Sequence, residues 1–321
     1  MKILIGITVD LNNYEDYFKR FNNKYGCSAI EFHLLEKDLG KGFHEKLKKV
    51  KGFIKANGIR HVSFHSPDRV LQSVLFEEKS AYLEADKEKL MLLMDSLKKL
   101  ADDIGQEIIM VFHQGIKLPS KEVDSMTSEE LAGLRKLLLK KAKQSYDWLM
   151  SKASGSKLSP MLENSPPMSA GDGNYHVLDM AFEDMEERIG NNGFVLDISH
   201  AAMCIEYYKQ SQKQGKISIP ALDVLKGKSG KIPESLHSLE SYVTKAKHNI
   251  KWIHISDANG IMGENEGLPI GAKGSIIDFK SLLRCIEKEI KSPIGVLEIA
   301  NAHKDYSLIG NSMDSLLKIN G

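Results

Sequence analysis

The sequence predicts an α/β fold, a single (β/α)8 TIM barrel over residues 1–321 with an extended insertion between its sixth and seventh strands. Two observations lead to this prediction. Eight short apolar runs have the continuous hydrophobicity of strands that are buried on both faces, and each run precedes a segment that is long enough for a helix. Because strand-to-strand crossovers are right-handed and eight strands close the sheet, this alternation predicts a parallel barrel. A chain of 321 residues is common for such a barrel as one domain.

The predicted strands share an apolar body, and most of them end on an acidic residue or a histidine. In chain order they are residues 3–9, 28–33, 60–65, 107–113, 158–163, 193–197, 250–255 and 294–299. The sixth run, Gly193-Phe194-Val195-Leu196-Asp197, is the clearest example. A carboxylate at the end of a buried strand must cap a helix, pair with a cation or bind a metal, because an unpaired buried charge is costly.

Helical patterns lie between these runs. Residues 81–104 place their leucines at near-helical intervals on a background of Lys, Asp and Glu. Thr127 and Glu130 form a capping-box pattern that opens another helix. Gly105 and Gly190 stand where helices are expected to end, just before the fourth and sixth strands.

The connection between the sixth and seventh strands is longer than a barrel requires. The insertion, residues 205–249, holds eight lysines against four acids and is therefore locally basic. A lid that approaches an anionic substrate is one interpretation, and a solvated helical insertion or a dimer contact is the other. Residues 164–175 contain prolines and glycines and are expected to shape the mouth of the barrel.

Composition excludes several classes of protein. A formal net charge of +1 argues against nucleic-acid binding by bulk electrostatics. Cys27, Cys204 and Cys285 are widely spaced and form no Cys-x-x-Cys pair, so neither a disulfide framework nor a thiolate zinc site is expected. The N-terminal apolar run is too short for a signal peptide, and no stretch approaches the ~20 residues of a membrane span. We therefore expect a cytoplasmic protein without a membrane partner, with a homo-oligomer left open.

Polar side chains gather at the carboxyl ends of successive predicted strands. In chain order they are Glu31 with His33, His65, His113, Glu163, Asp197, His254 with Asp257, and Glu298. In a parallel barrel these ends meet at one mouth, the face where barrel enzymes carry their active sites. A mixed set of His, Asp and Glu suits Zn²⁺, Mn²⁺, Co²⁺ or Fe²⁺. The remaining histidines are expected to be surface or structural residues: His44, His61, His176, His237, His248 and His303.

Several of these residues lie in short motifs. The motifs are His65-Ser66-Pro67, His113-Gln114-Gly115, Glu163-Asn164-Ser165, Asp197-Ile198-Ser199-His200, His254-Ile255-Ser256-Asp257 and the closing Glu298. In this order, and over nearly the whole chain, they resemble the motif series of the xylose isomerase-like barrels. That superfamily contains sugar and sugar-phosphate isomerases and epimerases, and also endonuclease IV, the apurinic-site nuclease of AP endonuclease family 2.

The resemblance implies a set of metal ligands. The metal common to the epimerases would be held by Glu163, Asp197, His254 and Glu298. A second ion would be held by His65, His113 and the bridging Glu163, as in endonuclease IV. His200 corresponds to a ligand of the third zinc of that nuclease, but the usual Asp and His partners are replaced by Asn265 and Gly267. Glu264 and Glu266 are candidate substitutes. We therefore expect one or two divalent ions of zinc, manganese or cobalt.

The activity implied by the resemblance is isomerisation or epimerisation of a small sugar or sugar phosphate through an enediolate. Glu163 and Glu298 would then be both metal ligands and proton carriers. The alternative is zinc-dependent hydrolysis of phosphodiesters at abasic sites, with DNA as the partner. Asp68 and Arg69 stand where the nuclease has aromatic and apolar wedge residues, and this departure favours the sugar enzyme. An inactive barrel that only binds a ligand is the third alternative.

Overall fold

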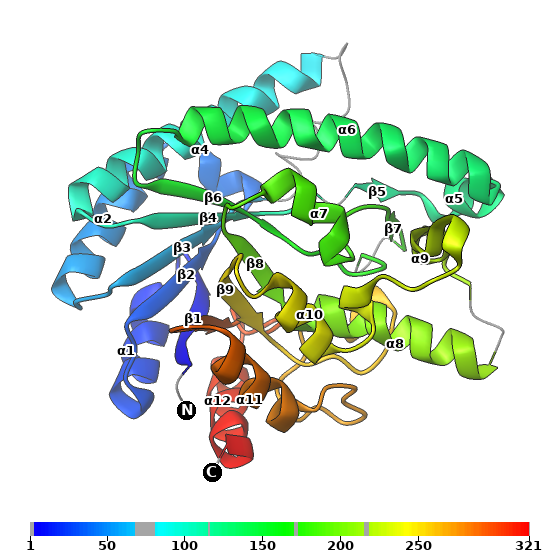
Figure 1. Cartoon of the computed structure of the whole chain (residues 1–321). Coiled ribbons are helices and arrows are strands. Elements are labelled where there is room, and N and C mark those ends of the chain that lie inside the picture. The colour runs from blue at the N-terminus through cyan, green and yellow to red at the C-terminus, as the bar shows by residue number, and fades with distance from the viewer. Residues whose placement is uncertain (1–2, 68–80, 115, 170–172, 215–217, 321) are drawn as a thin grey trace.

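Eight parallel strands close into a barrel, and helices surround it (Figure 1). The computed structural model describes residues 3–67, 81–114, 116–169, 173–214 and 218–320. Around the barrel the strands follow the order β1-β10-β9-β8-β6-β4-β3-β2, so that the first and last strands of the chain pair with each other. The predicted (β/α)8 barrel is confirmed.

Each predicted barrel strand is present, close to its predicted ends. The strands are β1 (Leu4–Asp10), β2 (Ala29–His33), β3 (His61–His65), β4 (Ile108–Phe112), β6 (Leu158–Glu163), β8 (Phe194–Asp197), β9 (Ile250–Ile255) and β10 (Ile294–Leu297). Two further strands, β5 (Lys117–Leu118) and β7 (Tyr175–His176), form a separate antiparallel pair that the sequence analysis did not predict. This pair joins the loop after β4 to the loop after β6, so the predicted mouth loop at residues 164–175 is tied down at its end.

The helices lie outside the strands. They are α1 (Tyr14–Tyr25), α2 (Phe43–Ala56), α4 (Ala81–Ile104), α5 (Ser120–Ser125), α6 (Ser128–Ala153), α7 (Phe182–Ile189), α8 (Ile198–Gln214), α9 (Pro220–Asp223), α10 (Leu239–Ala246), α11 (Phe279–Glu289) and α12 (Ser307–Asn320). Short 3-10 helices are η1 (Glu36–Leu39), η2 (Val224–Ser229), η3 (Glu234–Leu236) and η4 (Gly263–Asn265). Among the described residues, none of these helices combines the length and the apolar character that crossing a membrane requires.

The predicted helix boundaries have the expected chemistry. Thr127 Oγ1 accepts a hydrogen bond from the Glu130 N–H at 3.2 Å, and the Thr127 N–H donates to Glu130 Oε2 at 2.8 Å, so a capping box opens α6. Gly105 and Gly190 follow α4 and α7 with φ angles of 77° and 54°. Glycine adopts these left-handed values without the strain that a Cβ would cause.

The predicted insertion between β8 and β9 is largely helical. It contains the end of α8, then α9, η2, η3 and α10, and α9 packs against α5 and α6. Two tyrosines of α8 hold α9 in place. Tyr208 donates its hydroxyl to the Leu222 carbonyl at 2.6 Å, and the Tyr207 hydroxyl accepts from the Ile219 N–H at 3.0 Å. This part of the insertion is therefore packed onto the body of the protein.

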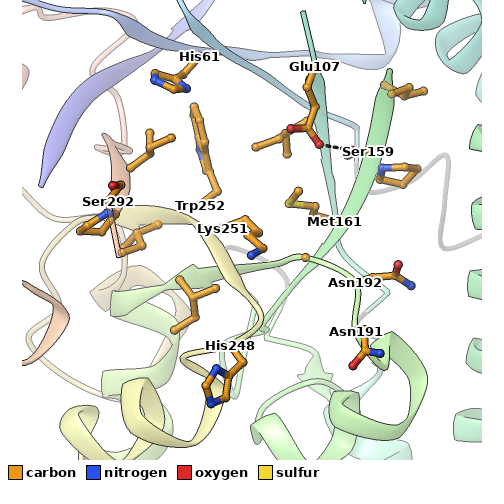
Figure 2. A pocket seen from close by; sticks show the side chains of 18 of the residues that line it. His61, Glu107, Ser159, Met161, Asn191, Asn192, His248, Lys251, Trp252 and Ser292 are labelled. Carbon is orange, nitrogen blue, oxygen red and sulfur yellow. Dashed lines mark hydrogen bonds between the residues drawn. The ribbon is translucent and has the colours of Figure 1, made fainter. Parts of the chain in front are cut away.

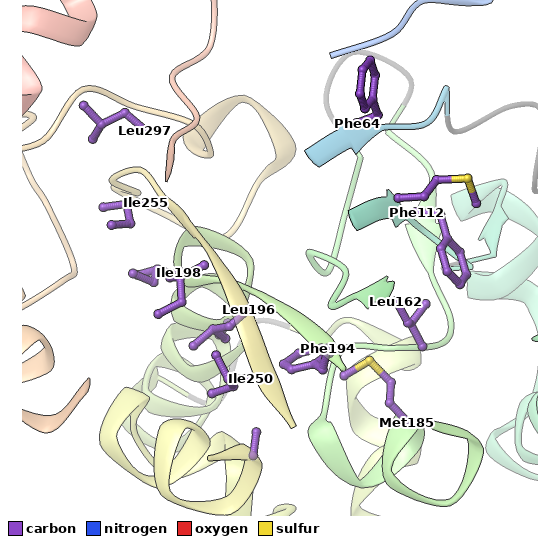
Figure 3. Close-up of a cluster of buried hydrophobic side chains, with 14 of the residues drawn as sticks. Phe64, Phe112, Leu162, Met185, Phe194, Leu196, Ile198, Ile250, Ile255 and Leu297 are labelled. Carbon is purple, nitrogen blue, oxygen red and sulfur yellow. The ribbon is translucent and has the colours of Figure 1, made fainter. Parts of the chain in front are cut away.

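Side chains alternate between the outside and the inside of the barrel wall, because successive residues of a strand point to opposite faces. Outward side chains such as Phe64, Phe112, Leu162 and Phe194 belong to one large apolar cluster beneath the helices, part of which is seen in Figure 3. Inward side chains form a separate cluster of Ala29, Ile109, Val111, Met161, Val195, Trp252 and Val296. The interior of the barrel is therefore a packed core and not a pore.

The next inward positions along these strands are polar. At a spacing of two residues, Val111 is followed by His113, Met161 by Glu163, Val195 by Asp197, Trp252 by His254 and Val296 by Glu298. Strand alternation keeps each of these pairs on the same face of the wall. The inner apolar cluster thus forms the floor beneath a layer of imidazoles and carboxylates.

Gly6 of β1 tests how closely the barrel wall is packed. A Cβ at this position would overlap the backbone carbonyl group of Ala29 on the neighbouring strand. Because backbone atoms cannot rotate away as a side chain can, Gly6→Ala should lower the free energy of unfolding by roughly 1–3 kcal/mol. Urea unfolding measures this change.

Gly52 is the matched control for that experiment. It is exposed in α2, and an added Cβ would meet nothing within 4 Å. Since alanine favours a helix more than glycine does, Gly52→Ala should raise stability by about 0.5–1 kcal/mol. Wild-type stability in Gly6→Ala would contradict the close contact between β1 and β2.

Candidate metal centre

Imidazoles and carboxylates from six strands converge at the carboxyl end of the barrel. They form three sets whose donor atoms lie within 4.8 Å of one another: Glu163 with Asp197, His254 and Glu298; His65 with His113 and Glu163; and His65 with His254 and Glu298. His65, Glu163 and Asp197 are the last residues of their strands, His254 lies in β9, and His113 and Glu298 directly follow β4 and β10. The structure therefore brings together every predicted ligand except His200.

His254 lies at the centre of the four-residue set. Its Nδ1 is 3.0 Å from Glu163 Oε1 and 2.7 Å from Glu298 Oε2. Two carboxylate oxygens thus converge on one ring nitrogen of a fully buried imidazole. A cation bound among these atoms would meet oxygen and nitrogen donors without a large rearrangement.

Asp197 is held in position by its own loop. Its Oδ1 accepts from the Ser199 hydroxyl at 2.8 Å and from the His200 N–H at 2.7 Å, an arrangement that also caps the start of α8. Asn164 adds two bonds to the Asp197 backbone: its Nδ2 donates to the carbonyl at 2.9 Å, and its Oδ1 accepts from the N–H at 2.7 Å. The carboxylate is therefore oriented by the protein alone.

The two oxygens of Glu163 face different partners. Oε1 faces His254, whereas Oε2 lies 3.1 Å from His65 Nε2 and 3.2 Å from His113 Nε2. The other ring nitrogen of His65, Nδ1, lies 3.0 Å from the Ser66 carbonyl oxygen, which is an acceptor only, so an N–H there leaves Nε2 for a ligand. A carboxylate that presents one oxygen to each set has the arrangement of a bridging ligand.

The carboxylates determine where protons reside in this cluster. Burial alone lowers the pKa of His65, but the hydrogen bond and charge of Glu163 outweigh it and raise the pKa to about 10. Burial also disfavours the charged form of His254, yet Glu163, Glu298 and Glu31 hold its pKa well above the usual value. For Glu163, burial raises the pKa, and the neighbouring imidazole charges reverse the shift and hold it well below the usual range. In the metal-free protein, protons thus occupy nitrogens that a cation would need.

The donor set fits a divalent cation. Imidazole nitrogens and carboxylate oxygens are ligands that Zn²⁺, Mn²⁺, Co²⁺ and Fe²⁺ share. Among the described residues that line this end of the barrel, positive charge comes from imidazoles alone, while Glu163, Asp197 and Glu298 supply negative charge. A bound cation would therefore neutralise acids that protons balance in its absence.

His200 lies beside the cluster but in none of the three donor sets. Its Nδ1 is 2.8 Å from the Asn164 carbonyl oxygen, and its Nε2 is 3.4 Å from Glu266 Oε2. Asn265, at the position of a nuclease ligand, bonds within its own loop instead. Of the two predicted substitutes, Glu266 reaches His200, and Glu264 does not line the pocket. Metal binding by His200 stays a prediction.

A cavity of about 410 Å³ opens above the cluster, a size within the range of small-molecule sites. The ends of β1 and β2 and the loops after β2 and β10 also contribute wall residues: Asp10, His33, Leu35, Asn301 and His303. Of these, His33 was among the strand-end residues expected at the mouth, and the other four were not. His303 was expected to be a surface or structural residue, and it is exposed at this mouth. The sequence did hold one signal for this position, because His303 follows the eighth predicted strand and loops at that end of a barrel surround the mouth. Asp68, Arg69 and Gly115 lie outside the described residues.

A larger cavity, about 1030 Å³, lies at the opposite, amino-terminal end of the barrel (Figure 2). Lys251, Glu107 and Asn192 lie on its rim, and the buried Trp252 separates it from the polar layer. None of the three donor sets found among the described residues lies there. We place the candidate site in the smaller cavity, because side chains from successive strands and their loops meet at the carboxyl end.

Other polar residues near the strand ends have different environments. Asp257 accepts from the backbone N–H groups of Ala258 at 2.8 Å and Gly271 at 2.9 Å, and from the Ser275 hydroxyl at 2.6 Å, so it organises the loop after β9. Glu31, which was expected among the strand-end residues at the mouth but not as a metal ligand, is fully buried with Oε1 3.0 Å from His254 Nε2. The other histidines expected to be surface or structural are exposed (His44, His237, His248), half-buried (His61) or buried in β7 (His176).

Comparison with known proteins places this geometry in context. The family model described as the xylose isomerase-like TIM barrel matches residues 21–318. Among solved structures, 3-keto-D-glucoside 4-epimerase YcjR from E. coli has a TM-score of 0.60 at 12% identity, over 98% of this chain and 99% of that one. A D-tagatose 3-epimerase-like protein has a TM-score of 0.56 at 16% identity (97% and 98% covered), and L-ribulose 3-epimerase 0.56 at 10% (98% and 92%). No curated protein matches the sequence. At these identities the structural similarities establish the fold.

The four-residue set should hold one metal ion. Glu163→Gln combined with Asp197→Asn removes two anionic ligands, so elemental analysis of the purified double variant should show that this ion is lost. Asp38→Asn, which alters a buried carboxylate bound to Lys46 and outside the donor sets, should keep the wild-type metal content. Because protons on His65 and His254 compete with the ion, metal affinity should rise with pH. An unchanged metal content in the double variant would locate the site elsewhere.

The set of His65, His113 and Glu163 should hold a second ion. Replacing both histidines with alanine should lower the metal content by about one ion per chain while the first site stays filled, because two-metal centres share a bridging ligand but keep separate remaining ligands. Native mass spectrometry of the metal-loaded protein counts the ions. Equal ion counts in the wild type and His65→Ala/His113→Ala would exclude this second site.

Proposed function

The chain belongs to the xylose isomerase-like TIM-barrel family, and from that premise we propose that it is a divalent-metal-dependent isomerase or epimerase of a small sugar or sugar phosphate. The observation that carries the proposal is the placement of Glu163 and Glu298. Both carboxylates face His254 Nδ1 at the floor of the pocket. Two carboxylates at such positions can remove a proton from one bound substrate and return it.

Glu163, Asp197, His254 and Glu298 would hold the ion, and zinc, manganese and cobalt all accept such donors. When bound, a divalent ion polarises a sugar carbonyl and its neighbouring hydroxyl, which acidifies the C–H between them and stabilises an enediolate. The protein's own share of the chemistry is to orient the carboxylates and to hold the proton.

Glu163 and Glu298 differ in their exposure to the pocket. The Glu163 side chain is fully buried, whereas that of Glu298 is 28% exposed. Glu298 is therefore the carboxylate that an entering substrate meets first. Glu163 acts from the floor, where His65 and His113 lie beside it and stabilise its anionic form. This asymmetry suits an acid–base pair in which the two groups address different faces of one carbon.

The similar structures support a sugar as the substrate class. The three that were compared are named as epimerases, or as an epimerase-like protein, of a keto-glucoside, of tagatose and of ribulose. The pocket volume of about 410 Å³ is compatible with a small polar molecule. The walls offer imidazole, carboxylate and amide groups, including His33, Asp10 and Asn301, as hydrogen-bond partners for hydroxyls.

An apurinic-site nuclease is the second candidate, and one observation favours it. His65 and His113 converge on Glu163 as a second ion would require. Against it, Asn265 is engaged within its own loop, and Gly267 has no side chain to offer a third ion. The formal net charge of +1 also supplies little general attraction for DNA. An inactive binding barrel is disfavoured because the candidate ligands converge.

Solvent deuterium exchange tests the proposed activity. The metal-loaded protein should exchange deuterium from D₂O into at least one member of a panel of ketoses and ketose phosphates, because the abstracting carboxylate equilibrates with solvent. Proton NMR follows the loss of the C–H signal. Glu298→Gln should slow the exchange by roughly 10²–10⁴-fold. Glu264→Gln is the matched control, since this exposed glutamate does not line the pocket, and it should retain the wild-type rate.

Assays of the same metal-loaded protein with DNA distinguish the proposed isomerase or epimerase from the apurinic-site nuclease. The protein should bind abasic duplex DNA weakly at physiological salt and should not cleave it, because few phosphate contacts are available to release counterions. Incision of an abasic duplex that requires the metal and is lost in Glu163→Gln, together with no exchange into any sugar, would replace the isomerase or epimerase by the nuclease.

A further inference from the structure

Glu31 is a fully buried carboxylate in β2 that lies outside the three donor sets. Its Oε1 is 3.0 Å from His254 Nε2, and its Oε2 is 3.1 Å from the same nitrogen. Oε2 also accepts from the Ser63 hydroxyl of β3 at 2.7 Å, and the Thr8 hydroxyl of β1 lies 3.4 Å from Oε1. Groups on three strands besides its own therefore determine the position of this carboxylate.

The two nitrogens of His254 face opposite environments. Nδ1 faces Glu163 and Glu298 of the donor set, and Nε2 faces Glu31. A neutral imidazole carries one proton, and the nitrogen without it has the lone pair that can bind a metal. A carboxylate that accepts from Nε2–H keeps the proton at Nε2. The lone pair is then at Nδ1, inside the donor set.

We propose that Glu31 is a positioning residue for the metal centre: it holds the proton of His254 on Nε2 and thereby leaves Nδ1 free as a ligand. The proposal rests on the proposed metal site and not on the identity of the substrate. In the other tautomer, the Nδ1–H bond would point at the ion, and the set of Glu163, Asp197, His254 and Glu298 would lose its nitrogen donor. Carboxylates that orient metal-binding histidines in this way also increase the basicity of the ring.

Packing alone does not account for an acid at this position. The nearest residue of β2 on the same inward face as Glu31 is Ala29, which is fully buried and apolar. A leucine or methionine would fill similar space without the cost of burying a carboxylate. Three hydrogen-bond donors face the two oxygens of Glu31, and His254 is the one among them that belongs to the donor set. The contact with His254, a candidate metal ligand, therefore gives a reason for a buried carboxylate at position 31.

Zinc affinity measures the contribution of Glu31 without any assay of catalysis. Competition with a chromophoric chelator should show about 10-fold weaker zinc binding in Glu31→Gln and about 100-fold weaker binding in Glu31→Ala. The effect is smaller for glutamine because its amide oxygen can still accept from the Nε2–H, whereas alanine leaves no acceptor. Asp38→Asn removes another buried carboxylate, one that bonds to Lys46 and the Leu35 N–H, and this variant should bind zinc as the wild type does.

Nitrogen-15 NMR of the zinc-loaded wild type reads the tautomer directly. The His254 ring, assigned by its loss in His254→Gln, should show a protonated Nε2 and a zinc-bound Nδ1. Zinc on Nε2, or wild-type zinc affinity in a folded Glu31→Ala, would overturn the proposal. If Glu31→Ala does not fold, Glu31→Gln decides: zinc affinity equal to that of the wild type overturns the proposal, and weaker binding with Nδ1 metallated in the wild type supports it.

The outcomes separate this proposal from the proposed function. A wild-type protein that binds no zinc would overturn both the metal site and the role of Glu31. Zinc bound through Nδ1 with weakened binding in the Glu31 variants, but without deuterium exchange into any sugar, would support the role of Glu31 and remove the proposed activity.

Discussion

The alternation of side chains across the barrel wall is the constraint on which the rest of the structure depends. Each of the eight strands presents every second residue to the interior, and the parallel arrangement brings all their carboxyl ends to the same end of the barrel. Apolar inward residues such as Met161, Val195 and Trp252 fill the lower interior. The next inward residues of the same strands carry the imidazoles and carboxylates. The apolar residues beneath the site and the polar residues that form it are therefore successive inward positions of the same strands. The packing of the apolar residues fixes the strands that carry the polar ones.

The polar layer exists because opposite charges are brought together in a place from which water is largely excluded. An isolated carboxylate there would be costly. Glu163, however, contacts the imidazoles of His65, His113 and His254. Glu31 contacts the His254 imidazole and the Ser63 hydroxyl. In the absence of a metal, protons on the histidines balance these acids. The same arrangement gives a cation a set of anionic and neutral donors once those protons leave. The same cluster can thus be neutralised either by protons on its histidines or by a bound cation.

The loops around the mouth are held by bonds that leave the donors free. Asn164 forms hydrogen bonds with the backbone carbonyl and the backbone N–H of Asp197. Asp257 accepts hydrogen bonds from backbone N–H groups of the loop after β9. The short pair of β5 and β7 ties the loops after β4 and β6 together. The contacts of Asn164 and of the β5–β7 pair join different loops, whereas those of Asp257 act within one loop, and together they limit the rearrangement that ligand binding requires. A site prepared in this way loses less conformational entropy when a substrate enters.

The sequence by itself determined the barrel, the strands that compose it and the candidate ligands at their ends. It could do so because continuous apolar runs, helix caps and acids or histidines at the ends of apolar runs are each visible within a few neighbouring residues of the sequence. Only the tertiary structure decided which of these side chains meet. The partners in the His254–Glu31 contact are 223 residues apart in the chain, and nothing near either residue in the sequence indicates the other. The place of His303 at the mouth is a second example, because ring closure and loop packing set its position and no local pattern encodes it. The two-sided contacts of Glu163 and the approach of Glu266 to His200 were expected only through the resemblance of the motifs to a known family.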